Sequence, residues 1–83
     1  MIGQIVSSKA GRDKNYFLVI VKEDGNSVYV CDGKERPIER PKRKNIKHLA
    51  FTSTVITQDS FKSNKSLRKA IAIYKSRNQK EDS

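Results

Sequence analysis

The sequence has one cysteine, Cys31, and one histidine, His48. A single cysteine excludes an internal disulfide and a Cys-rich zinc site, and no second His or Cys stands at metal-ligand spacing from His48. A lone histidine gives no evidence of acid–base catalysis, and no glycine-rich phosphate loop of the Walker or Rossmann type is present. The sequence therefore predicts no enzyme, no metal site and no cofactor.

Long apolar runs are also missing. The longest one, Phe17 to Val21, is far too short to cross a bilayer. The N-terminus has no basic segment followed by an apolar core, so no signal peptide is expected. A free thiol within an apolar strand is typical of a reducing compartment. We therefore expect a soluble cytoplasmic protein that does not insert into membranes.

Acidic residues are scarce relative to basic ones. Nine Asp and Glu stand against 18 Lys and Arg, which gives a net charge of +9 on 83 residues. A single domain of this size has a small core, and a hydrophobic fraction of 35% leaves much solvated surface. So strong a positive field favours a polyanionic partner, either nucleic acid or an acidic membrane surface. Nucleic acid is preferred, because the chain lacks a long amphipathic helix with lipid-facing bulk.

Residues 1–57 show short strand patterns separated by turn residues. The pattern predicts a mostly β fold, a small and strongly bent barrel of the SH3-like kind. The second strand is apolar on both sides, so that one side fills the barrel and the other must be covered. Tyr16, Leu18 and Ile20 form one of these two sides, and Phe51 is assigned to the core. The predicted strands are Met1 to Val6, Tyr16 to Lys22, Ser27 to Cys31 and Leu49 to Thr57, with a possible short one at Lys34 to Ile38.

Residues 58–83 are predicted to hold a linker, a C-terminal α-helix and a tail that frays from Asn78. Leu67, Ala70, Ile71 and Tyr74 have helical spacing, and Ser63 and Asn64 are both good N-caps. The spacing predicts a helix over about 64–77. A helix of this length is marginal alone in water, and we expect it to dock on the side formed by Tyr16, Leu18 and Ile20.

Two segments concentrate the positive charge. Residues 34–48, KERPIERPKRKNIKH, hold seven Lys and Arg with two prolines, which predict an extended surface loop. Gly11 permits a tight reversal, from which the neighbouring cations project. Basic segments of this kind follow a phosphate backbone, although a merely solvated surface is the alternative reading. The candidate contacts are Lys9, Gly11, Arg12, Lys14, Lys34, Arg36, Arg40, Lys42, Arg43, Lys44, Lys47 and His48.

Two aromatic residues, Tyr16 and Phe17, adjoin the predicted glycine turn. Aromatic side chains beside cations can stack on unpaired bases. Packing in the core is the more common role of such residues. We therefore assign both to the core, with base stacking as the alternative.

The stretch GQIVSSKAGRDKNYFLVI resembles a KOW motif, a strand–loop–strand unit with a central glycine found in several ribosomal proteins and transcription elongation factors. Continued through CDGKERPIERPKRKNIKHL, it resembles a family of small bacterial KOW-domain proteins related to large-subunit ribosomal proteins. The resemblance implies a KOW barrel that binds ribosomal RNA or the ribosome, with the loop around Arg12 as a contact. The alternative is a KOW-type protein-interaction module of the transcription elongation or translation machinery.

Overall fold

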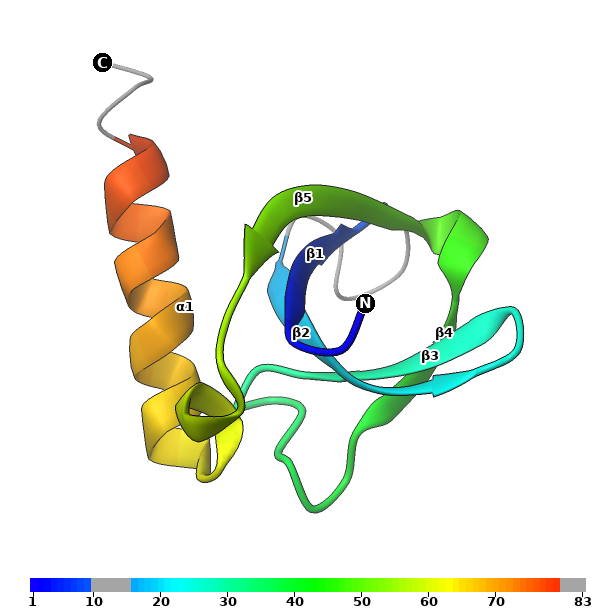
Figure 1. The fold of residues 1–83 in the computed structure, drawn as a ribbon, viewed down its shortest axis with the longest axis horizontal. Helices are drawn as coiled ribbons and strands as arrows, with labels where there is room; N and C mark the ends of the chain where they lie inside the picture. Colours follow the sequence, from blue (N-terminus) through cyan, green and yellow to red (C-terminus); the bar gives the residue numbers. More distant parts are fainter. Residues whose placement is uncertain (10–15, 80–83) are drawn as a thin grey trace.

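The computed structural model describes residues 1–9 and 16–79. Five strands form one antiparallel sheet in the order β4-β3-β2-β1-β5, which curves strongly, and a C-terminal helix stands beside it (Figure 1). The predicted mostly β fold with a C-terminal helix is therefore confirmed. The elements are β1 (Gln4–Ser8), β2 (Phe17–Asp24), β3 (Ser27–Cys31), β4 (Lys42–Asn45), β5 (Leu49–Val55), the 3-10 helices η1 (Ile46–His48) and η2 (Gln58–Phe61), and α1 (Asn64–Gln79).

Turn residues set the path of the chain around β3. Gly25 has a φ of 61° in the two-residue connection between Asp24 and Ser27, which closes the hairpin of β2 and β3. After β3, the Oδ1 atom of Asp32 accepts hydrogen bonds from the backbone N–H groups of Lys34 and Arg36, at 2.8 and 2.9 Å. These bonds fold residues 32–36 into a compact bend. The short strand predicted at Lys34 to Ile38 is therefore wrong.

The segment 34–48 was predicted to be an extended loop, and this is wrong for its second half. Residues Lys42–Asn45 form β4, which pairs antiparallel with β3 through Val30↔Lys42 and Val28↔Lys44. The edge of β3 offers unpaired backbone groups, and a strand of charged residues satisfies them without apolar side chains. Asn45 then accepts a hydrogen bond from the Lys47 N–H at 2.9 Å, which starts η1.

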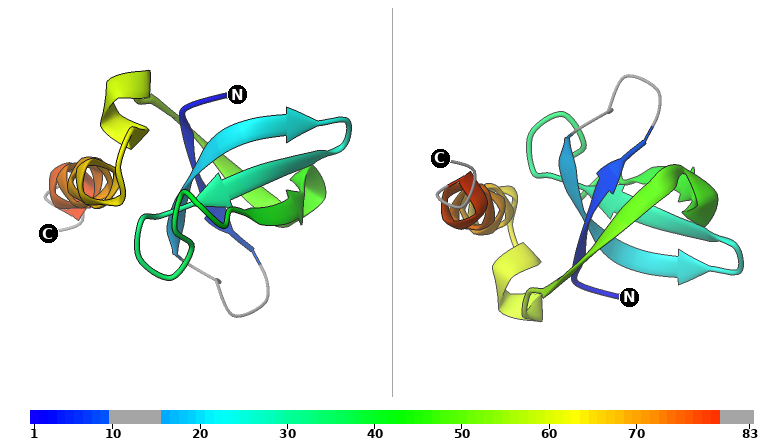
Figure 2. Two further views of the ribbon diagram at one scale, coloured as in Figure 1. Left: turned by 90° about the horizontal axis from the view of Figure 1, so that it is seen from below. Right: turned by 90° about the horizontal axis from the view of Figure 1, so that it is seen from above.

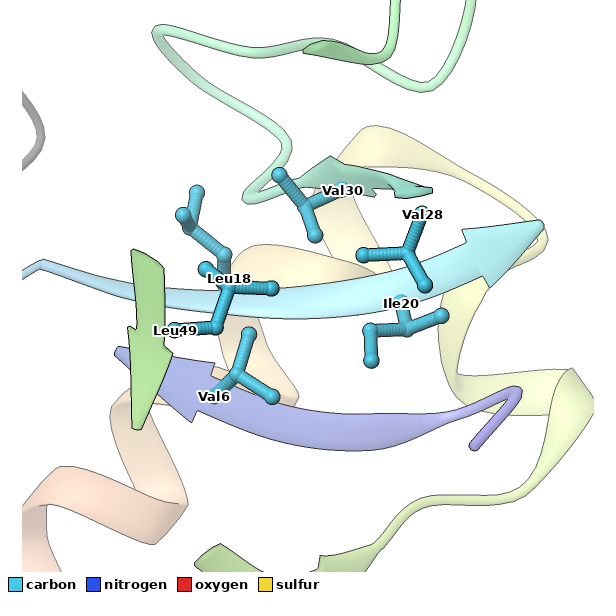
Figure 3. Packing of buried hydrophobic residues seen from close by; sticks show 6 residues of the cluster. All are labelled: Val6, Leu18, Ile20, Val28, Val30 and Leu49. Atoms are coloured by element: carbon cyan, nitrogen blue, oxygen red, sulfur yellow. The ribbon is translucent and has the colours of Figure 1, made fainter. Parts of the chain in front are cut away.

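Both sides of β2 are covered, as its apolar pattern predicted. One side contributes Leu18 and Ile20 to a cluster of residues that are at most 3% exposed (Figure 3). The other side contributes Val19 to a second cluster, which contains residues of α1. The first cluster consists of Val6, Leu18, Ile20, Val28, Val30 and Leu49, and the second of Ile5, Val19, Cys31, Leu67 and Ile71.

The helix docks on the opposite side of β2 from the one predicted. Leu18 and Ile20 lie in the cluster that excludes α1. Tyr16 is 51% exposed and belongs to neither buried cluster, so its assignment to the core is wrong. The ring of Phe17 instead meets the ring of Tyr74 edge to face, with centroids 5.1 Å apart. Because β2 is apolar on both sides, its alternation of side chains does not tell which side faces the helix.

The predicted face of α1 is confirmed. Leu67 and Ile71 are buried, and Ala70 and Tyr74 are half-buried. The Ser63 Oγ atom accepts a hydrogen bond from the Ser66 N–H at 3.2 Å, as an N-cap does. The helix runs to Gln79, so the fraying predicted from Asn78 is wrong for the first two residues of that tail.

The assignment of Phe51 to the core is wrong. Its side chain is 39% exposed and belongs to neither buried cluster. It lies on β5, the last strand in the pairing order, where side chains are covered from one flank only.

Within residues 1–9 and 16–79, no helix is long and apolar enough to span a membrane.

Candidate nucleic-acid interface

Backbone pairing joins the end of β1 to the second half of the basic segment. The Lys9 N–H donates to the carbonyl oxygen of His48 at 2.8 Å, and Ser8 pairs with Leu49. The Nζ atom of Lys44 donates to the Oγ atom of Ser8 at 3.2 Å. Lys9 therefore lies close to Lys44 and His48, although β2 and β3 separate it from them in the sequence.

The first half of the basic segment is a loop, residues 32–41, at the same side of the molecule. Both views in Figure 2 show this loop on the side of the sheet where β1 ends and β2 begins. The first residue of α1 anchors this loop. The Asn64 side chain accepts a hydrogen bond from the Ile38 N–H at 2.8 Å and donates one to the Glu39 carboxylate at 2.7 Å. The helix thus fixes the middle of the loop.

The predicted contact residues differ in how accessible their charge is. Arg36 and Lys44 are half-buried, and the guanidinium of Arg43 lies 3.8 Å from the Asp24 carboxylate. His48 is exposed and joins Lys9 through its backbone. Gly11, Arg12 and Lys14 lie outside the described residues. Within residues 1–9 and 16–79, the exposed cations with no ion-pair partner include Lys9, Lys34, Arg40, Lys42 and Lys47.

Most carboxylates of the described residues serve the fold and leave these cations unneutralised. Asp32 shapes the bend that follows β3, and Glu39 accepts from Asn64 of α1. Glu23 lies 3.7 Å from the N-terminal ammonium group, and Asp59 lies 2.9 Å from Lys62. The positive charge at the junction of β1 and η1 therefore remains available to a polyanion.

The sequence analysis did not assign the basic residues of α1 to the binding surface. The helix contains five Lys and Arg, but no Asp or Glu. One of them reaches the basic loop, because the Nη1 atom of Arg68 donates to the Gly33 carbonyl oxygen at 2.8 Å. The signal in the sequence was the complete lack of acidic residues over 64–79. The five are Lys65, Arg68, Lys69, Lys75 and Arg77.

The assignment of Cys31 to the core is confirmed, since its side chain is fully buried. Burial, together with the nearby charges of Asp32 and Glu39, raises the pKa of the Cys31 thiol to about 12. The thiol is therefore protonated at neutral pH and is a poor nucleophile.

In the described part of the chain, no group of three or more His, Cys, Asp or Glu residues is placed to hold a metal ion.

No protein-family model and no curated protein matches this chain. The resemblance to KOW-domain proteins therefore stays a prediction.

Proposed function

We propose that this protein is a small RNA-binding module with an SH3-like (KOW) barrel, and that its target is structured RNA, ribosomal RNA or the ribosome. The observation that carries the proposal is the hydrogen bond between the Lys9 N–H and the His48 carbonyl oxygen, which joins the two basic segments. We propose that the exposed basic residues near this bond and those of the 32–41 loop act together as one binding surface, which we call the basic face. It is defined as Lys9, Lys34, Arg40, Lys42, Lys47 and His48, all of which are exposed.

Binding is driven by phosphate neutralisation. Lysine ammonium groups act as mobile point charges, whereas arginine adds planar, bidentate hydrogen bonding. Each phosphate that the protein neutralises releases a counterion, so affinity falls as salt rises. If about five to eight phosphates are neutralised, the log–log salt slope for single-stranded RNA is roughly −3.5 to −6.

The predicted glycine turn belongs to the same surface in this proposal. Lys9 and Tyr16 flank residues 10–15, and the Ser8 N–H donates to the Tyr16 carbonyl oxygen at 3.3 Å. The two ends of that segment are thus held together beside His48. Arg12 and Lys14 follow Lys9 within a few residues of the sequence, and the proposal includes them among the phosphate contacts.

The proposal is tested by fluorescence anisotropy with a labelled RNA stem-loop over a series of salt concentrations. Lys47→Gln removes one charge from the basic face, and we expect affinity to fall about three- to tenfold, with a salt slope smaller by about 0.7 to 0.9. Lys62→Gln is the matched control, because it removes the same charge from an exposed lysine that is outside the basic face and already lies 2.9 Å from the Asp59 carboxylate. Its variant is expected to bind like the wild type.

Two results contradict the proposal. A wild-type slope near −1 removes the electrostatic mechanism, and equal effects of the two substitutions remove the basic face as the binding surface. Partners that remain bound after nuclease treatment favour the alternative of a protein-interaction module.

A further inference from the structure

A groove of about 460 Å³ lies between α1, the start of β2 and the bend after β3. This volume is within the range of roughly 300 to 1,000 Å³ that is typical of small-ligand sites. It adjoins the basic face, since both include Lys34. The residues that line it include Tyr16, Lys34, Glu35, Arg68, Ala72 and Lys75.

One wall of the groove is the ring of Tyr16, which is not packed in the core. Tyr16 is 51% exposed, whereas its neighbour Phe17 packs against Tyr74. A half-exposed aromatic ring beside cations is the usual platform on which proteins stack an unpaired base. The apolar side chains of Phe17 and Ile71 also line the groove and extend the surface available to a flat ring.

Three cations and two carboxylates surround this aromatic wall. Arg68 is fixed by its bond to the Gly33 carbonyl oxygen, while Lys34 and Lys75 are exposed. A phosphate is attracted by this set of cations. The carboxylates of Asp32 and Glu35 oppose an acidic peptide, but they accept hydrogen bonds from the exocyclic amino group of a base. A nucleotide therefore satisfies the mixed polarity better than an acidic peptide does.

We propose that this groove takes one unpaired nucleotide of the bound RNA, with its base stacked on Tyr16 and its phosphate bound by Lys34 and Lys75. This inference rests on the proposed function and extends the binding surface from the basic face to α1. Bases inside an A-form duplex are not available for stacking on a protein ring. The protein consequently prefers RNA with an unpaired nucleotide over a blunt duplex of the same length.

The first test uses the absence of tryptophan from the sequence. Tyr16→Trp places a single reporter in the groove, and we expect single-stranded RNA to quench its fluorescence while inorganic polyphosphate binds without quenching it. Ile73→Trp is the matched control, because Ile73 is 47% exposed and lines a different groove, formed with Ile5 and Ile56. Its fluorescence is expected to stay unchanged with either ligand.

The outcomes separate this inference from the proposed function. RNA that binds by anisotropy without quenching the reporter overturns the nucleotide groove and leaves the basic face intact. RNA and polyphosphate that both fail to bind overturn both proposals. Quenching by polyglutamate in place of RNA overturns the inference in favour of an acidic protein partner.

The second test measures affinity. Tyr16→Ala is expected to weaken binding of single-stranded RNA about five- to a hundredfold, which corresponds to the loss of one stacked base. Its affinity for polyphosphate and its salt slope stay unchanged, because no charge is removed. Equal weakening toward polyphosphate overturns the stacking role, since it shows a general disturbance of the surface.

A third test compares two substitutions that each remove one lysine charge from α1. Lys75→Gln and Lys69→Gln remove the same charge from exposed positions of one helix, but Lys75 lines the groove whereas Lys69 is not among its lining residues. We expect Lys75→Gln to weaken RNA binding about three- to tenfold and Lys69→Gln to have little effect. Equal effects of the two overturn the phosphate role of Lys75.

Discussion

The two sides of the sheet are closed in different ways. The side with Leu18 and Ile20 is sealed by residues from four hydrogen-bonded strands, β1, β2, β3 and β5. The other side is covered by one helix, and partly buried residues such as Phe17, Val21 and Tyr74 surround its buried centre. A single helix leaves the edges of its contact open, and the groove beside Tyr16 lies at such an edge. The less complete layer is thus the one that offers a binding site.

The largest expected effects come from removing one buried side chain on each side. Ile20 and Leu67 are both fully buried, so replacement by Ala is expected to cost about 2 to 5 kcal/mol of unfolding free energy at either site. Ile20→Ala should be the more costly, because paired strands cannot move to fill the cavity whereas a docked helix can shift. Urea unfolding followed by circular dichroism measures both.

Val55→Ala is the control for this pair. Val55 is 61% exposed on β5, and its replacement is expected to change the unfolding free energy by about 0.5 kcal/mol or less. Should Leu67→Ala cost more than Ile20→Ala, the helix would be as rigid a part of the core as the strands.

A smaller effect is expected from the glycine beneath the helix. Gly33 has a φ of +82°, and a Cβ atom there would lie 2.5 Å from the Asn64 carbonyl oxygen at the start of α1. Gly33→Ala is therefore expected to cost about 2 to 4 kcal/mol through strain and displacement of the helix. Gly25 has a φ of +61° with nothing within 4 Å of an added Cβ, so Gly25→Ala should cost only about 1 kcal/mol.

Thermal or urea unfolding of the two glycine variants measures this difference. Similar costs at Gly33 and Gly25 would mean that the helix yields without resistance, and that its docking on the bend after β3 is loose.

A pH-dependent effect on the fold concerns the thiol of Cys31, which lies in the same buried cluster as Leu67 and Ile71. The pKa of Cys31 is raised from 9.0 to about 12 in the folded state, so the folded protein retains the proton that the unfolded chain loses above pH 9. The stability that this difference contributes is fully present below about pH 9 and is lost as the pH rises toward 12.

Urea unfolding between pH 8 and 11 measures this loss of stability, and labelling with a thiol reagent near pH 8 tests the protection of the thiol itself. The native thiol is expected to react far more slowly than the thiol of the chain unfolded in urea, because it is both buried and protonated. Rapid labelling of the native protein would show that α1 leaves the sheet readily.

Local patterns predicted the elements whose signals are contained in a few neighbouring residues. The strand Ser27–Cys31 has the predicted bounds, the turn at Gly25 is present, and α1 begins at Asn64. The strand β4 was missed because its residues, KRKN, have no apolar alternation and become a strand by pairing with β3.

The site was predicted as two basic segments that converge on one side of the β fold, without the contacts that join them. The cations of 34–48 and Lys9 were named from the sequence, but nothing local indicated that Lys9 lies beside His48. Lys75 of α1 was missed, because a lysine on a helix is ordinarily a solvated residue. Its position in the groove depends on which face of the sheet the helix covers.

By itself, the amino-acid sequence determined the charge, the turn positions, the β character and the apolar face of α1, since each depends on composition or on short-range periodicity. The tertiary structure decided which side of β2 receives α1 and which cations share a surface. Side-chain alternation makes two apolar sides of a strand equivalent. Only the packing of segments far apart in the chain, through pairs such as Phe17 with Tyr74 and Lys9 with His48, distinguishes them.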